Sequence, residues 1–156
     1  MIEIENKRVY ISGKIGEMTI SDATRERFAR VARFLASKGA TVIDPASEYI
    51  QDSARLHFEV SHHIQSYGSM LLYMLHWLRT CTHVYMMSGW QLSPGAVVEH
   101  DFACAIGRHV LYERREDAEG ALVDVWTERE DLHDKVDRNS FVNENLDKLW
   151  LPVNDQ

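Results

Sequence analysis

An uninterrupted apolar run at residues 83–87, followed closely by a helix start, most constrains the fold of this chain. The run, HVYMM, shows no alternation of apolar and polar residues, which is typical of a strand buried on both faces of a parallel sheet. Parallel strands need a crossover connection between them, and this connection is usually a helix. The chain is therefore expected to alternate strands with helices.

The first 112 residues repeat this alternation. Strands are expected at residues 8–12, 40–43, 83–87 and 109–112, and helices at residues 21–38, at residues 66–79 and from residue 93 onward. The first of these helices has an apolar face of Phe28, Val31, Ala32 and Leu35. This order predicts an α/β fold: a doubly wound, mainly parallel sheet of about five strands with flanking helices, Rossmann- or flavodoxin-like.

The pattern is weaker in two segments. Between residues 48 and 66 we expect a loop that lies over the ligand site. Residues 116–137 are interpreted as a charged helix or as an extra strand at 121–126, and residues 141–150 as a short helix capped by Ser140. We expect one domain over residues 1–156, with a core at 8–113 and a C-terminal extension at 114–156.

Composition excludes several classes of function. No stretch approaches the roughly 20 apolar residues of a membrane span, and the charged N-terminus is unlike a signal peptide, so we expect a cytoplasmic protein without a membrane partner. A net charge of -7 with scattered Lys and Arg argues against a nucleic acid polymer as partner. Cys81 and Cys104 form no CxxC motif, and the histidines lack ligand spacing, so neither a disulfide nor a metal site is expected.

A helix start at residues 93–96 indicates an anion site. Ser93 can cap the helix, Pro94 suits its first position, and the small Gly95 and Ala96 leave the backbone accessible to a ligand. Glu99 follows in the second turn, on the side of Gly95 and Ala96. A phosphate and a nucleophilic carboxylate can share such a pocket, although the helix dipole alone also favours an acid near a helix start.

The expected crevice lies at the carboxyl ends of the strands, where open α/β sheets bind ligands. The loop after the first strand brings Gly13, Lys14 and Ile15 to this edge as further candidate binding residues, with Lys14 as the nearest cation for a phosphate. Trp90 packs under the following loop or against a base, and packing is favoured because burial of the indole accounts for it. His100 faces about 100° away from Glu99 on the helix, so capping or a subunit contact is expected rather than catalysis.

The chain resembles the nucleoside 2-deoxyribosyltransferase-like superfamily, which includes the deoxynucleoside 5′-monophosphate N-glycosidases. The motifs VYISGKIG, GATVIDP and GWQLSPGAVVEHDFACAIGRHVLY carry this resemblance over residues 9–112. It implies that Glu99 is the nucleophile and that Tyr10 contacts the sugar and this carboxylate. The position of Ser93 is a serine in the nucleotide hydrolases, where it holds the 5′-phosphate, and an aspartate in the nucleoside transferases.

The activity that this resemblance implies is cleavage of the base–sugar bond of a (deoxy)nucleoside 5′-monophosphate. The reaction would pass through a covalent glycosyl-glutamate intermediate and needs no cofactor. A nucleoside deoxyribosyltransferase is the alternative, because a second base can attack the same intermediate. The resemblance also implies a homodimer or larger homo-oligomer, and the segment at residues 70–78, apolar nearly all round, needs cover from a second subunit or from the C-terminal segment.

The sequence departs from the family pattern at the group that assists the leaving base. Relatives carry an acid in the helix before the third strand and an aspartate at the start of that strand, where this chain has Met74 and Thr82. Neither residue can protonate a base. Either His76, Asp52 or Glu59 acts from nearby, or the chain is a slow enzyme or one that acts on an unusual base, or it is a non-catalytic nucleotide-binding protein; an interaction protein is a further alternative.

Overall fold

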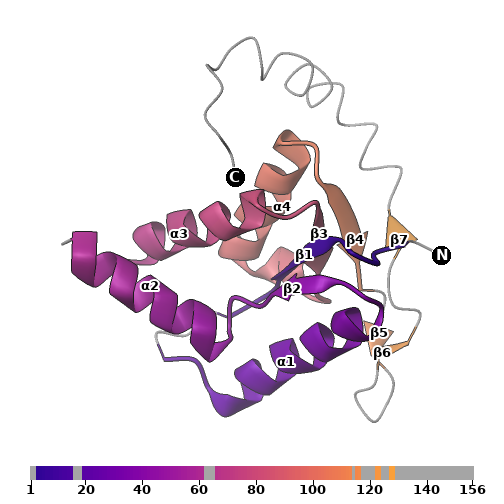
Figure 1. Cartoon of the computed structure of the whole chain (residues 1–156), viewed down its shortest axis with the longest axis horizontal. Helices are drawn as coiled ribbons and strands as arrows, with labels where there is room; N and C mark the ends of the chain where they lie inside the picture. Colours follow the sequence, from indigo (N-terminus) through magenta and orange to yellow (C-terminus); the bar gives the residue numbers. More distant parts are fainter. Residues whose placement is uncertain are drawn as a thin grey trace.

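A parallel sheet forms the centre of the computed structural model (Figure 1). The structure describes residues 3–15, 19–61 and 66–113, and beyond these the backbone of residues 115–116, 122–123 and 127–128. The parallel strands are β1 (Arg8–Ser12), β2 (Thr41–Ile43), β3 (His83–Met86) and β4 (His109–Tyr112). The short β7 (Thr127–Glu128) joins β4 in the antiparallel sense, giving the order β2-β1-β3-β4-β7. The predicted α/β class is confirmed.

Helices cover both faces of this sheet. They are α1 (Asp22–Ser37), α2 (Glu48–Ser61), α3 (Tyr67–Arg79) and α4 (Pro94–Ala105), and the 3-10 turn η1 (Trp90–Leu92) precedes α4. In Figure 1, α1 lies on one side of the strands and α3 and α4 lie on the other. No helix in the described part of the chain is both long and apolar enough to cross a membrane.

Each face of the sheet has its own apolar cluster, because side chains of a strand alternate between the two faces. The cluster under α1 includes Val9, Ile11, Phe28, Val31, Leu35 and Tyr85. The cluster under α3 and α4 includes Tyr10, Met74, Leu78, Val84, Ala96 and Ala103. The polar side chain that follows Tyr10 on the second of these faces is Ser12, at the carboxyl end of β1.

The expectation of a loop over residues 48–66 is wrong, because residues 48–61 form α2. Ile50, Ala54 and Phe58 recur at intervals of one helical turn and are buried. The side chain of Ser47 accepts a hydrogen bond from the Ile50 N–H at 3.3 Å, which caps the helix. Apolar residues on the exposed face of α2 hide this stripe in the sequence. The remainder of the expected loop includes residues 62–65, which lie outside the described part.

The expectations beyond residue 113 are tested only at a few backbone positions. The strands β5 (Arg115–Glu116) and β6 (Leu122–Val123) form a separate antiparallel pair. β6 falls within residues 121–126, where an extra strand is one of the two interpretations. The helix expected at 141–150 lies outside the described residues.

Candidate active site

The carboxylate of Glu99 is buried against the carboxyl end of β1, with 7 % of the residue exposed. The hydroxyl of Tyr10 donates a short hydrogen bond to Oε2, and the hydroxyl of Ser12 donates one to Oε1 at 3.0 Å. Tyr10 and Ser12 are two residues apart in β1, so both side chains lie on the face that α4 covers. Each carboxylate oxygen therefore has its own donor.

The start of α4 places Glu99 in this position. Ser93 caps the helix, its Oγ accepting a hydrogen bond from the Ala96 N–H at 3.3 Å, and Pro94 occupies the first turn. Gly95, Glu99 and Ala103 follow at four-residue intervals and are all buried. The structure thus turns Glu99 toward the sheet, on the same side of the helix as Gly95.

Burial determines the ionisation of this pair. Desolvation raises the pKa of Glu99 from 4.5 to about 7, and the hydrogen bonds from Tyr10 and Ser12 act in the opposite direction without cancelling it. Desolvation and the neighbouring charge of Glu99 raise the pKa of Tyr10 well above its ordinary value, so its hydroxyl remains a donor. The result is an acid held by two hydroxyls that changes charge near neutral pH.

The N-terminus of α4 is approached closely by α3. A Cβ atom at Gly95 would lie 2.6 Å from the Tyr67 hydroxyl oxygen, so only glycine allows this approach without a shift of Tyr67. Tyr67 is the first residue of α3 and is largely exposed. Sequence reasoning missed it, since an exposed aromatic residue at a helix start carries no signal of a partner in another helix.

The loop after β1 packs Gly13 and Ile15 against neighbouring side chains and leaves Lys14 exposed. Lys14 is exposed, and its carbonyl accepts a hydrogen bond from Nη2 of Arg27 at 2.5 Å. Ile15 packs against the cluster under α1, on the face of the sheet opposite Glu99. Gly13 is buried, and a Cβ atom there would lie 3.0 Å from Met87 Sδ. Gly13 and the partly buried Ile15 thus have packing contacts, and Lys14 is the most exposed of the three residues.

We expect Gly13→Ala to destabilise the protein by about 1–3 kcal/mol. The added methyl would also lie 3.1 Å from Met87 Cβ and 3.3 Å from Phe28 Cζ, and both residues are buried and unable to move freely. Urea unfolding measures the change. Gly68→Ala is the matched control, because nothing lies within 4 Å of that position in α3, and there alanine should stabilise by up to about 1 kcal/mol. Equal effects of the two variants would contradict the packing role of Gly13.

The groups considered for the leaving base are not gathered at Glu99. Met74 is buried in the same apolar cluster as Tyr10. Thr82 lies at the other edge of the sheet, where its N–H donates to the Arg8 carbonyl at 3.1 Å. His76 is exposed on α3.

The two acids of α2 that were considered for this role face solvent as well. Asp52 is exposed and forms an ion pair with Arg55, and Glu59 is also exposed. None of the three substitutes named from the sequence is therefore buried near the Glu99 carboxylate.

Two polar residues that interact with Glu99 or Tyr10 were missed. Ser12 carried a usable signal, because it follows Tyr10 by two residues in a strand and must share its face. Asp44 directly follows β2, whose last residue, Ile43, is the register partner of Tyr10. Burial raises the pKa of Asp44, its charge contributes to the raised pKa of Tyr10, and its Oδ1 accepts from the Ala46 N–H at 2.9 Å.

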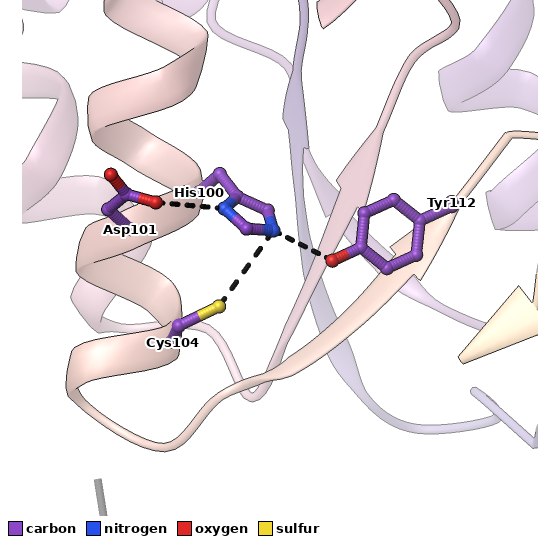
Figure 2. Close-up of polar contacts among 4 residues, drawn as sticks. All are labelled: His100, Asp101, Cys104 and Tyr112. Atoms are coloured by element: carbon purple, nitrogen blue, oxygen red, sulfur yellow. Dashed lines mark hydrogen bonds and ion pairs between the residues drawn. The ribbon is translucent and has the colours of Figure 1, made fainter. Parts of the chain in front are cut away.

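Trp90 and His100 pack against each other beside the start of α4. Their ring centroids are 4.4 Å apart with 20° between the planes. His100 is 7 % exposed and contacts Asp101, Cys104 and Tyr112 (Figure 2), so it is a buried residue and not the cap or subunit contact that was expected. Of the two alternatives for Trp90, the structure shows packing.

Comparison with known proteins gives a family but no activity. No curated protein matches the chain. Residues 7–112 match the family model described as a domain of unknown function, DUF4406. The match runs from the start of β1 to the end of β4 and includes Tyr10, Ser12, Ser93 and Glu99. Because it covers most of the sequence, the chain belongs to the DUF4406 family.

Proposed function

We propose that this protein is an N-glycosidase that cleaves the base–sugar bond of a (deoxy)nucleoside 5′-monophosphate. The observation that carries the proposal is the buried Glu99 carboxylate, oriented by the hydroxyls of Tyr10 and Ser12 at the carboxyl edge of a parallel sheet. Ligands of open α/β folds bind at this edge. The resemblance of residues 9–112 to the nucleoside 2-deoxyribosyltransferase-like superfamily supports the same assignment.

In the proposed reaction, the Glu99 carboxylate attacks the anomeric carbon through an oxocarbenium-like transition state. The bond from this carbon to the base nitrogen breaks, its electron pair leaves with the base, and the base takes a proton from solvent. Water then attacks the anomeric carbon of the glycosyl ester and loses a proton. The sugar 5-phosphate departs and the carboxylate is regenerated. Tyr10 and Ser12 hold the attacking group still throughout.

The start of α4 suits the 5′-phosphate. The first amides of a helix lack partners within the helix, but the Ala96 and Val97 N–H groups already donate to Oγ and the carbonyl of Ser93. Pro94 has no N–H, so the Gly95 amide is the one that the cap leaves for a ligand. Since Ser93 Oγ accepts from Ala96, its own hydrogen can point to a phosphate oxygen. We therefore assign phosphate binding to Ser93 and Gly95, and to Ala96 a capping contact.

Incubation with a panel of nucleosides and nucleoside 5′-monophosphates, followed by chromatography, tests the activity. Free base and sugar phosphate are expected from the monophosphates. Exchange of the base, seen only when a second base is added, would instead identify a deoxyribosyltransferase. Mass spectrometry of protein denatured during turnover should show the added mass of the sugar phosphate on Glu99.

A second candidate is a non-catalytic nucleotide-binding protein. The buried Met74 favours it, because an apolar side chain occupies the helix position where relatives carry an acid. Calorimetric binding of a monophosphate without release of base would support this candidate.

The resemblance further leads us to propose a cytoplasmic homodimer or larger homo-oligomer, whose contact surface would include the exposed apolar residues Leu56, Val60 and Leu72 of α2 and α3. Sedimentation equilibrium measures the oligomeric state.

Tyr10→Phe should move the acid limb of the pH–rate profile upward by about one pH unit. The Tyr10 hydroxyl stabilises the ionised Glu99 and lowers its pKa, so its removal raises the pKa above about 7. The measurement is kcat/KM for base release between about pH 5 and 9. Tyr73→Phe, which removes a hydroxyl bonded to Ser53, is the control and should keep the wild-type limb. An unchanged acid limb of the pH–rate profile in Tyr10→Phe would show that Tyr10 does not stabilise the ionised Glu99 in the enzyme.

A further inference from the structure

A buried histidine adjoins the proposed nucleophile without contacting its carboxylate. The Nε2 atom of His100 lies 2.7 Å from the Tyr112 hydroxyl and 3.9 Å from Cys104 Sγ, and Nδ1 lies 3.1 Å from Asp101 Oδ1 (Figure 2). Both ring nitrogens are thus engaged, one with the end of β4 and one with the next residue of α4. These contacts fix the plane of the imidazole.

This fixed ring carries Trp90 on its face. The two rings are stacked at 4.4 Å, and Trp90 also lies 6.2 Å from the Tyr112 ring, measured between centroids. Trp90 is the first residue of η1, and its carbonyl accepts from the Ser93 N–H at 3.0 Å. The stacked ring of Trp90 is therefore connected to Ser93, the N-cap of α4, by the Trp90 residue itself and one backbone hydrogen bond.

The other end of the same turn is also tied to β4. The Ser88 N–H donates to Glu113 Oε1 at 3.1 Å, while Oε2 of Glu113 accepts from the Tyr85 hydroxyl at 3.0 Å. The segment from Ser88 to Ser93 thus contacts Glu113, the residue after β4, through Ser88, and the Tyr112 ring of β4 through Trp90. η1 belongs to no ladder of the sheet, so side-chain contacts, among them the stack of Trp90 on His100, support it laterally.

We propose that His100 is a positioning residue, whose ring holds Trp90 and through it the turn that presents Ser93 and Gly95 to the substrate phosphate. This inference rests on the proposed function. If the turn is already ordered in the free protein, less conformational entropy is lost when the ligand binds. The stack of Trp90 on His100 should therefore increase the affinity for the phosphate. Because Glu99 is held separately by Tyr10 and Ser12, the chemical step should not depend on the stack.

Two substitutions of His100 distinguish the contribution of its aromatic ring from that of its hydrogen bonds. His100→Phe keeps a flat ring against Trp90 and loses the polar contacts, whereas His100→Gln keeps a polar group and loses the ring. His100→Gln should raise KM for the deoxynucleoside 5′-monophosphate up to about tenfold at constant kcat, as expected for the loss of an aromatic pair. His100→Phe should restore most of the wild-type KM, and kcat/KM for the parent nucleoside, which lacks the phosphate, should be the same in all three proteins.

Hydrogen exchange gives a readout that does not depend on activity. In His100→Gln and in Trp90→Leu, the amides of residues 88–97 should exchange faster than in the wild type, while those of α1 keep their rates. The double variant should exchange no faster than either single variant, because both remove the same contact. Wild-type exchange in His100→Gln, additive effects in the double variant, or an unchanged KM would overturn the proposal.

The proposed function and the positioning role can fail separately. If the wild type releases no base, the N-glycosidase assignment fails, and calorimetry with the same monophosphate replaces KM as the measure of affinity. Weaker binding in His100→Gln, restored in His100→Phe, would then still support the positioning role. Equal binding in the three proteins, or none in the wild type, would refute it.

Discussion

Glu99→Gln is expected to lower the rate of base release from a deoxynucleoside 5′-monophosphate on the order of 10⁴-fold or more, the range seen when a covalent nucleophile is removed. Glutamine matches the shape of glutamate. Its carbonyl oxygen can accept the hydrogen bond from Tyr10, and its amide can donate to Ser12 Oγ. The variant thus preserves the buried contacts, and it removes the negative charge and with it the ability to form a glycosyl ester. Chromatography of the released base under single-turnover conditions measures the loss.

The control for this experiment is Glu59→Gln, which removes one carboxylate from the exposed face of α2. It should leave the rate unchanged, whereas a general effect of charge would slow both variants. Binding of the monophosphate to Glu99→Gln, measured by calorimetry, should persist because Ser93 and Gly95 are untouched. Retention of more than about a tenth of the wild-type rate in Glu99→Gln would exclude Glu99 as the nucleophile.

The sequence predicts those parts of the fold that depend on local patterns. Three helices, α1, α3 and α4, begin directly after the serines that cap them, which are Ser21, Ser66 and Ser93. The helix α2 was not predicted from the sequence, because exposed Leu56 and Val60 interrupt its polar face and obscure the amphipathic pattern. Periodicity reports where apolar residues recur, and it cannot say which of them tertiary packing buries.

The candidate site shows the same division between local and distant information. The contact of Tyr10 with Glu99 is what the family resemblance implies, and the position of Ser12 follows from strand alternation. The approach of Tyr67 to Gly95 depends on how α3 packs against α4, which no local pattern encodes. Thr82, which directly precedes β3, lies at the edge of the sheet opposite the carboxyl ends of the strands, as the strand direction predicts.

The stability of the wild type should fall relative to Glu99→Gln by about 2.5 kcal/mol as the pH rises from about 5 to 8. The pKa of Glu99 is about 7 in the folded protein, against 4.5 for an unperturbed glutamate. Between these values the folded state binds more protons than the unfolded state, so the free energy of unfolding decreases with rising pH. The contribution is fully present below the unfolded pKa and is lost as the pH passes through the folded pKa.

Urea unfolding of both proteins at several pH values measures this difference, and the comparison cancels every titrating group that the two proteins share. Glutamine does not titrate, so any slope in the difference belongs to position 99. The Tyr10→Phe background should shift the loss of stability to higher pH, because the hydroxyl that lowers the pKa of Glu99 is absent. A flat difference would mean that the hydrogen bonds from Tyr10 and Ser12 cancel the desolvation of Glu99, and a difference of opposite sign would mean that they outweigh it. Either result would contradict the conclusion that burial sets the pKa of Glu99 and that the carboxyl changes charge near neutral pH.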